Sequence, residues 1–292
     1  MKQTKKQTKY FYMFISPWLA GFFLLTFIPL AYSIYLSFTQ YNGLSAPELI
    51  GIRNYSDILF HDDLFRKSLI NSFVYAIIAV PSSLVLALLI AFLLSKESKT
   101  SNLFQIVFFF PSIAAGAAVY TVIKLLLRGE GGLINYLLSL FGIKGPNWLT
   151  DSKWAMIALA IANLIFCGQQ MLIFLAGIKQ IPVSYYEAAK IDGAGSVKCF
   201  FKITLPLISN VFVFNLVMGI INALQIFVQP LIMTGGGPFK KTYMYGMYIY
   251  DSGFSFGRFG YAASLAWIMY LIILFISMVI LKSLQKMMNY ED

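Results

Sequence analysis

The sequence predicts an all-α, polytopic membrane protein with six transmembrane helices, and three observations support this fold class. Of the 292 residues, 59% are hydrophobic and only 12% are charged. The mean hydropathy is +0.74. Soluble domains carry about a quarter charged residues, so the chain is too apolar for an aqueous fold. The apolar residues also gather in runs of about 20, the length that crosses a bilayer as a helix.

Six apolar runs are long enough to be spans, and polar loops separate them. They are residues 11–38, 69–94, 103–126, 154–176, 207–233 and 261–281. The first run is too long for the apolar core of a signal peptide, and no small-x-small cleavage site follows it. We therefore expect a tail at 1–10, a transmembrane domain at 11–281 and a second tail at 282–292.

The chain has a net charge of +10, and the distribution of its basic residues orients these spans. Lysines occupy both tails and the short loops that contain Lys96, Lys179 and Lys198, whereas the opposite side has longer loops with mixed charges. By the positive-inside rule both termini are cytoplasmic. The basic residues are explained by the lipid bilayer and need no nucleic-acid partner. The two cysteines, Cys167 and Cys199, indicate neither a disulfide framework nor a metal site.

The longest polar stretch in the second half of the chain is residues 181–206, here called the interspan loop, which the same rule places in the cytoplasm. Ser184 stands three residues before Glu187, the spacing of a capping box at the start of a helix. Gly193 predicts a break, because glycine reaches backbone angles that other residues avoid. A second helix can begin at Ser196. The loop is therefore expected to form two short helices joined by a turn.

The second of these helices is expected to be amphipathic. Its apolar side carries Val197, Phe200, Phe201 and Leu205, and its basic side carries Lys198 and Lys202. Such a helix can lie on a bilayer surface with its lysines toward anionic headgroups.

The fourth and fifth predicted spans contain amide side chains at helical spacing. The fifth carries Asn215, Asn222, Gln225 and Gln229, which one continuous helix would confine to an arc of roughly 80°. The fourth carries Asn163 and Gln170, seven residues apart and so on one face. Such amides can form interhelical hydrogen bonds worth about 0.6 to 2 kcal/mol each. Alternatively they line a route for a neutral polar solute, because amides pair with hydroxyl groups without a counter-charge. Both interpretations stay open.

Missing residue types narrow the function. No acidic residue lies inside a predicted span, which disfavours a carrier coupled through a buried carboxylate. His61 is the only histidine, so a histidine metal pair is excluded, and no catalytic group is predicted. The glycine run before Pro238 lacks the glycine-lysine step of a phosphate loop. We expect the driving energy to come from another chain.

The run from Glu187 to Ala194, EAAKIDGA, followed by ITLP ending at Pro206, resembles the EAA loop of binding-protein-dependent ABC importer permeases. Other segments resemble the sugar branch of that family, in order along nearly the whole chain. They are GIRNY (51–55), FFFPS (108–112), NWLTD (147–151), MLIFLAGIKQIP (171–182), MTGGGP (233–238) and FSFGRFGYAAS (254–264).

The resemblance implies the all-helical fold of a type I ABC importer permease, also called MetI-like, in a bacterial cell membrane. Its implied partners are a second permease, two ATP-binding cassette ATPase subunits, an extracellular solute-binding protein and a carbohydrate substrate. ATP and Mg²⁺ would bind to the ATPase subunits, with no cofactor in this chain. The residues expected to dock on the ATPase are Glu187, Ala188, Ala189, Asp192, Gly193 and Gly195.

Three alternatives remain at this point. A permease for a glycerol-phosphate-type substrate would have the same fold, although the amides lack the arginine that favours a phosphate. A secondary carrier or channel would transport a neutral polar solute without ATP. A membrane-embedded scaffold would have no solute path, and it leaves the interspan loop without a purpose.

Overall fold

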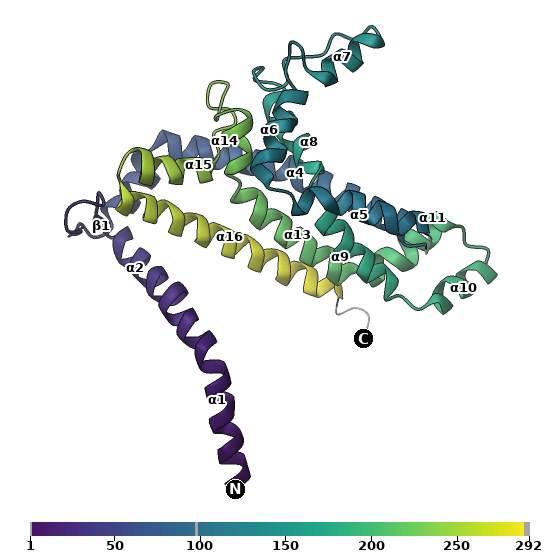
Figure 1. The fold of residues 1–292 in the computed structure, drawn as a ribbon, viewed down its shortest axis with the longest axis horizontal. Helices are drawn as coiled ribbons and strands as arrows, with labels where there is room; N and C mark the ends of the chain where they lie inside the picture. Colours follow the sequence, from purple (N-terminus) through teal and green to yellow (C-terminus); the bar gives the residue numbers. More distant parts are fainter. Residues whose placement is uncertain (1, 97–98, 289–292) are drawn as a thin grey trace. The chain divides into compact units, whose positions relative to one another are not determined.

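The computed structural model describes residues 2–96 and 99–288, and its regular structure is almost entirely helical (Figure 1). Within the described residues, three single helices are long and apolar enough to cross a membrane, and three bent helix pairs raise the number to six. The single helices are Tyr10–Ser37, Asp63–Leu94 and Phe259–Ser283. The predicted all-α, polytopic fold class is confirmed.

The chain forms two compact units, and the larger comprises residues 63–248 and 272–292. Its central helix is α4 (Asp63–Leu94). The helices that pack most extensively against it are α8 (Ala155–Leu164), α9 (Gly168–Lys179) and α13 (Ser209–Leu224). α4 buries small residues such as Ala79 and Ala87 in these contacts. Small side chains let neighbouring membrane helices approach closely, so α4 forms the core of this unit.

Two of the predicted spans are bent pairs rather than straight helices, and a third bent pair joins the end of the interspan loop to the fifth predicted span. The pairs are α5 (Lys99–Ile113) with α6 (Gly116–Leu126), bent by 100°; α8 with α9, bent by 48°; and Ser196–Leu207 with α13, bent by 72°. The prediction of one continuous helix at 103–126 is wrong, because Ala114 and Ala115 leave the helix between α5 and α6. Hydropathy measures the apolar length of a segment and contains no information about where its backbone hydrogen bonds are interrupted.

The outer end of the fifth predicted span also differs from a single helix. α13 ends at Leu224, and a separate helix, α14 (Val228–Met233), follows after a break. Pro230 contributes to the break because it has no amide hydrogen to donate to the carbonyl of Ile226. That carbonyl lies so close to Gly246 that a Cβ built there would be 2.9 Å from its oxygen. The predicted helix at 207–233 is therefore two helices.

The smaller unit comprises residues 1–62 and 249–271. Its helices are α1 (Lys2–Phe22), α2 (Ile28–Ser37), α3 (Arg53–Ser56) and the first part of α16 (Phe259–Met288), with π-helical turns at Phe23–Phe27, Asp57–His61 and Asp251–Ser255. Strands β1 (Thr39–Gln40) and β2 (Glu48–Leu49) form a short antiparallel ladder. Asn54 closes this region, since its Nδ2 donates to the carbonyls of Ser37 (3.0 Å) and Thr39 (2.9 Å). The GIRNY segment therefore anchors the first loop.

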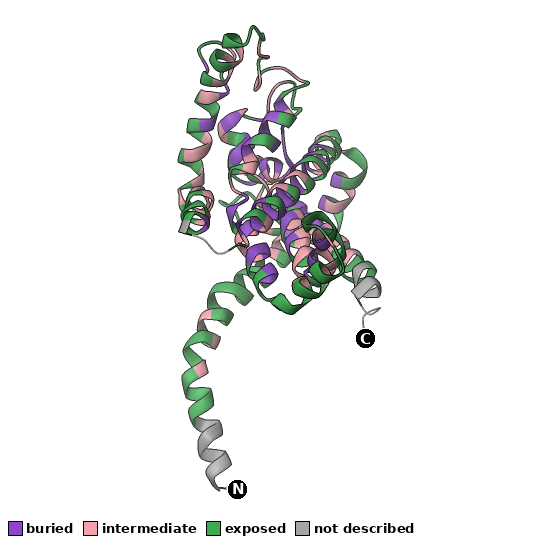
Figure 2. Cartoon of the chain, turned by 90° about the vertical axis from the view of Figure 1, so that its right-hand side faces the viewer, coloured by how far each residue is buried: buried purple, intermediate pink, exposed green. Residues whose placement is uncertain are grey.

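The span formed by α1 and α2 exposes its apolar side chains on all sides (Figure 2). Leu25 is 80% exposed, and Trp18 is 65% exposed. Its backbone hydrogen bonds are made within the helix, which is the condition for a helix to lie in hydrocarbon.

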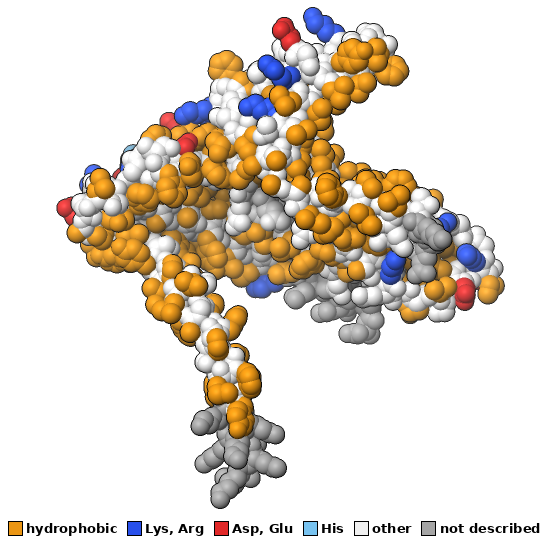
Figure 3. Space-filling model, viewed as in Figure 1, with side chains coloured by type: hydrophobic (Ala, Val, Ile, Leu, Met, Phe, Trp, Pro, Cys, Tyr) orange, Lys and Arg blue, Asp and Glu red, His pale blue; other side chains and the backbone are white. Residues whose placement is uncertain are grey.

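In the larger unit, charged side chains gather mainly around two sets of elements, and hydrophobic side chains cover much of the other surface in this view (Figure 3). One group lies at α10 (Val183–Ile191) and the other around α7 (Leu133–Leu140) and its neighbouring loops. An apolar belt between charged ends is the surface expected for a protein that spans a bilayer. Of the expected C-terminal tail at 282–292, residues 282–288 continue α16, and the rest lie outside the described residues.

Candidate functional site

The interspan loop folds as two helical arms, and a glycine produces the turn between them. α10 (Val183–Ile191) is followed by Gly193, whose φ is +74°, a value that residues with a Cβ rarely adopt. The Gly193 amide donates to the carbonyl of Lys190 (3.0 Å), and the Ala194 amide donates to that of Ala189 (2.8 Å). Together these bonds form a Schellman motif, which confirms the predicted break at Gly193.

The second arm begins at Ser196, as predicted, with α11 (Ser196–Cys199). It continues through a π-helical turn at Phe200–Thr204 into α12 (Leu205–Leu207). The hydroxyl groups of Tyr186 and Thr204 lie 3.0 Å apart and link the two arms by a hydrogen bond. The interspan loop is therefore a folded unit with a fixed turn and a bond between its arms.

Two details of the loop differ from the prediction. The capping box does not form, because Ser184 already lies inside α10 and Pro182 precedes the helix; no side chain of the described residues caps this end. The buried side of the second arm carries Thr204, while Val197 and Phe201 are 72% and 60% exposed. The second difference is that Phe200–Thr204 form a π-helical turn rather than regular α-helix. Because Val197 and Phe201 leave apolar surface on this arm, its contact with a bilayer stays a prediction.

The residues expected to dock on a partner lie on the surface of this loop. Five of them are exposed, namely Glu187, Ala188, Asp192, Gly193 and Gly195. The sixth, Ala189, is half-buried. Ile191, at the end of the same helix, is 88% exposed. An exposed alanine, Ala188, and an exposed isoleucine, Ile191, on a short helix allow another protein surface to approach closely. The geometry permits docking, and the role of these residues stays a prediction.

A second candidate site is a cavity of about 230 Å³ within the helices of the larger unit, here called the polar cavity. Its polar lining is Tyr75 and Ser83 on α4, Tyr120 on α6, Asn163 on α8, Cys167 between α8 and α9, Gln169 and Gln170 on α9, and Asn222 on α13. None of the described residues that line it is charged. Amide and hydroxyl groups both donate and accept hydrogen bonds, so this lining suits an uncharged, hydroxylated solute.

The bend between α8 and α9 is located beside this cavity. A Cβ at Gly168 would lie 2.1 Å from the carbonyl oxygen of Phe108, so only glycine lets α5 approach the start of α9 this closely. Asn163 before the bend and Gln170 after it both line the polar cavity, as their seven-residue spacing predicts. Asn222 joins them from α13.

The other three predicted amides lie elsewhere. Asn215 is 1% exposed, and its Nδ2 has no hydrogen-bond partner among the described atoms. Gln225 is exposed, directly after the end of α13. Gln229 is buried on α14, where its Nε2 donates to the carbonyl of Leu159 (2.7 Å) and its Oε1 accepts from the hydroxyl of Tyr75 (2.9 Å). The predicted single arc is wrong, because α13 stops before the last two of its four amides.

Several lining residues escaped the sequence prediction because it considered amides in two spans only. Tyr75 and Ser83 are eight residues apart on α4, which places them about 80° apart around that helix. Tyr75 stands among apolar residues, and Ser83 follows Ser82. A search for every neutral polar side chain inside a predicted span finds them, along with Tyr120 and Cys167.

A bundle of broken and continuous spans, with a folded loop on one side and an uncharged polar cavity inside, defines a multi-pass membrane protein of the transporter class. The chain belongs to the family described as binding-protein-dependent transport system inner membrane component, whose family model matches residues 60–290. It is therefore an inner membrane component of a transport system, and this family is a family of transporter permeases.

Relatives with curated descriptions cover most of the chain. The probable ABC transporter permease protein YesP of Bacillus subtilis is 37% identical, over 96% of this chain and 92% of its own length. The multiple sugar-binding transport system permease protein MsmF of Streptococcus mutans is 33% identical, over 89% and 90%. The sulfoquinovosyl glycerol transport system permease protein SmoG of Agrobacterium fabrum is 33% identical, over 87% and 82%.

Solved structures show the same fold. A chain of a bacterial alginate ABC transporter, crystallised in complex with an alginate pentasaccharide-bound periplasmic protein, matches with a TM-score of 0.84. The match covers 99% of this chain and 98% of that chain at 19% identity. A second structure, of a bacterial ABC transporter involved in the import of alginate, matches with a TM-score of 0.83 at 20% identity. The type I importer permease architecture expected from the sequence is confirmed.

Proposed function

We propose that this chain is a permease subunit of an ATP-driven carbohydrate importer and that the polar cavity is part of the solute route. The names of its relatives, which include transport systems for lactose, for multiple sugars and for arabinooligosaccharides, support the substrate class. The second support is physical, since sugars are neutral and rich in hydroxyl groups. The structural observation that most supports this proposal is the polar cavity itself.

Burying polar groups in the apolar interior of a membrane protein is unfavourable unless they are hydrogen-bonded or hydrated. Asn163, Gln170 and Asn222 present their amides to a shared space, whereas Gln229 makes two bonds to protein groups. The three cavity amides are therefore available for a solute. Because no charged residue is among the described lining, a phosphorylated substrate such as glycerol phosphate is less favoured.

The interspan loop would couple this route to ATP hydrolysis. The proposed partners are a second permease, two ATPase subunits that bind ATP and Mg²⁺, and an extracellular binding protein that delivers the sugar. Both termini and the interspan loop would face the cytoplasm. In this arrangement Glu187 and Ala188 contact an ATPase subunit, and closure of the ATPase dimer moves the loop and the spans attached to it.

The test is uptake by the reconstituted complex, with and without ATP, for lactose, maltose and glycerol 3-phosphate. We expect ATP-dependent uptake of a neutral sugar. Replacing Asn222 by leucine removes an amide that can bond to a sugar hydroxyl, which weakens binding about two- to tenfold for a bond worth about 0.5–1.5 kcal/mol. The comparison variant is Gln225→Leu, which changes an exposed amide outside the polar cavity and should leave uptake unchanged.

Each other outcome has a definite meaning. Unchanged uptake kinetics in Asn222→Leu would assign the cavity amides to helix packing. Uptake by the purified single chain without ATP would make it a secondary carrier or channel. ATP-dependent uptake of glycerol 3-phosphate alone would move the chain to the phosphate-transporting branch.

A further inference from the structure

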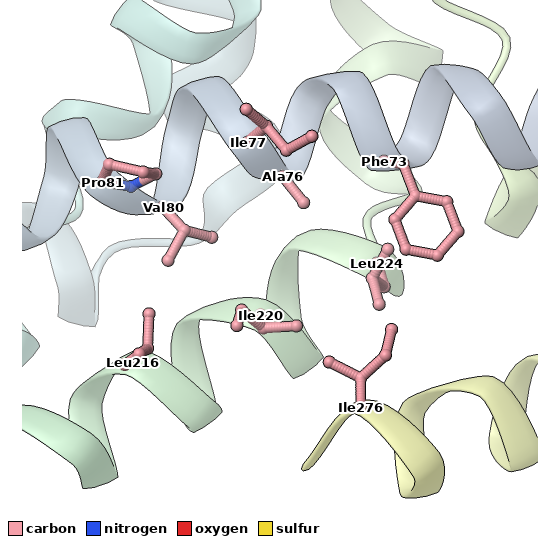
Figure 4. Close-up of a pocket in the computed structure, with 9 residues that line it drawn as sticks. All are labelled: Phe73, Ala76, Ile77, Val80, Pro81, Leu216, Ile220, Leu224 and Ile276. Atoms are coloured by element: carbon pink, nitrogen blue, oxygen red, sulfur yellow. The ribbon is translucent and has the colours of Figure 1, made fainter. Parts of the chain in front are cut away.

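Two cavities of opposite character lie on either side of α13. The polar cavity of about 230 Å³ is on one side, and on the other is an apolar pocket of about 280 Å³ between α4, α13 and α16 (Figure 4). Every described residue that lines the apolar pocket is hydrophobic, including Leu216, Ile220 and Leu224 on α13. Among the described residues, Val80 is the one that lines both spaces. Val80 therefore stands between them.

The fit between Val80 and α13 depends on a glycine. Val80 points from α4 toward α13 and is 4% exposed (Figure 4). A Cβ built on Gly219 would lie 3.1 Å from Cγ1 of Val80 and 3.4 Å from Nε2 of Gln170. Gly219 thus lets the isopropyl group of Val80 approach the backbone of α13 while Gln170 stays in the polar cavity. Val80 and Gly219 therefore meet at the boundary between the two spaces.

We propose that Val80 is a specificity-determining residue, which confines the transported solute to the polar cavity and keeps the apolar pocket from accepting any part of it. This inference rests on the proposed function for the identity of the polar cavity as a solute space. A hydroxylated solute can form hydrogen bonds in the polar cavity. An alkyl substituent on that solute cannot reach the apolar pocket, because Val80 lies between the two spaces. Replacing Val80 by alanine removes two methyl groups from the boundary between the polar cavity and the apolar pocket. The apolar pocket then becomes a subsite for an alkyl group attached to a polar ligand.

The test uses Cys167, a native thiol that lines the polar cavity. In a Cys199→Ser background it is the only thiol of the chain, because the sequence has two cysteines. The purified complex is treated with methyl, propyl and pentyl methanethiosulfonate, and the modification rate is followed by intact mass of this chain. With Val80 present, the rate should fall as the alkyl group lengthens. In Val80→Ala, the pentyl-to-methyl rate ratio should rise about fourfold for each methylene accommodated, which corresponds to about 0.8 kcal/mol per buried methylene.

Two further variants complete the experiment. Val85→Ala makes the same change at a position on α4 that is 58% exposed and lines neither space, so it should keep the parent's dependence on chain length. Gly219→Ala should slow every reagent, because its Cβ presses on Val80 and also contacts Gln170 in the polar cavity. Size-exclusion chromatography verifies that each complex is assembled.

The proposal is overturned if Val80→Ala and Val85→Ala show the same chain-length profile. It is equally overturned if Cys167 reacts with none of the reagents, since the polar cavity would then be closed to small molecules. Because no sugar is used, these outcomes are independent of the uptake measurements that test the proposed function.

Discussion

Substituting Gly193 tests whether the turn in the interspan loop is needed to couple ATP hydrolysis by a partner subunit to transport. A Cβ at Gly193 would meet no atom within 4 Å, so a side chain there creates no clash within this chain. The penalty is conformational, because φ is +74° and the left-handed region costs a residue with a Cβ about 1–2 kcal/mol. That energy reduces the population of the native turn roughly 5- to 30-fold relative to competing conformations. We expect Gly193→Val to lose most binding-protein-stimulated ATPase activity and uptake while still inserting and assembling.

Asparagine provides the matched control for Gly193→Val, since it is similar in size to valine and tolerates the left-handed region far better. Gly193→Asn should therefore retain most of the stimulated ATPase activity in proteoliposomes. Full stimulation in Gly193→Val would refute the requirement for this turn. Equal loss in both variants would show that bulk at the surface, rather than backbone conformation, is what the partner rejects.

Two further predictions concern buried amides that hold the fold. Gln229→Leu leaves the carbonyl of Leu159 and the hydroxyl of Tyr75 without their partner, so the purified protein should lose about 1–3 kcal/mol of stability. Thermal denaturation in detergent measures the loss, and Gln225→Leu, at an exposed position, should change little; equal losses would contradict the assigned bonds. Asn54→Ala removes two bonds that close the first loop and should lower stability by a similar amount, while proteolysis of that loop accelerates. Unchanged proteolysis would show that Asn54 does not hold the loop.

The sequence was sufficient for the fold class because the bilayer imposes simple requirements on length and polarity. Each span needs about 20 apolar residues whatever its neighbours are, and all six runs are helical in the structure. The turn at Gly193 was predictable for a related reason, since one glycine after a helix satisfies a local motif that depends on no distant contact.

Pro230 is a local signal for the break between α13 and α14, but the close packing at the breaks involves segments far apart in sequence and was not predictable. The start of α9 fits against α5 because Gly168 lies beside the carbonyl of Phe108, sixty residues earlier. At the gap between α13 and α14, Gly246 lies close to the carbonyl of Ile226, twenty residues earlier. Neither glycine is distinguishable in the sequence from one that merely tolerates its position.

The same breaks explain why half of the predicted amides line the polar cavity. Spacing along an ideal helix placed Gln229 beside Asn222, but the break after Leu224 moves Gln229 onto α14, where protein groups satisfy it. Tyr75 lines the polar cavity, and its hydroxyl donates a hydrogen bond to Oε1 of Gln229. Gln229 therefore holds a lining residue in position although it does not line the cavity itself. Gln229 keeps one donor and one acceptor site, but it is 1% exposed and does not line the polar cavity, so a solute there does not reach it. The useful distinction among amides in a membrane span is therefore whether a partner already satisfies them, and only the structure supplies that information.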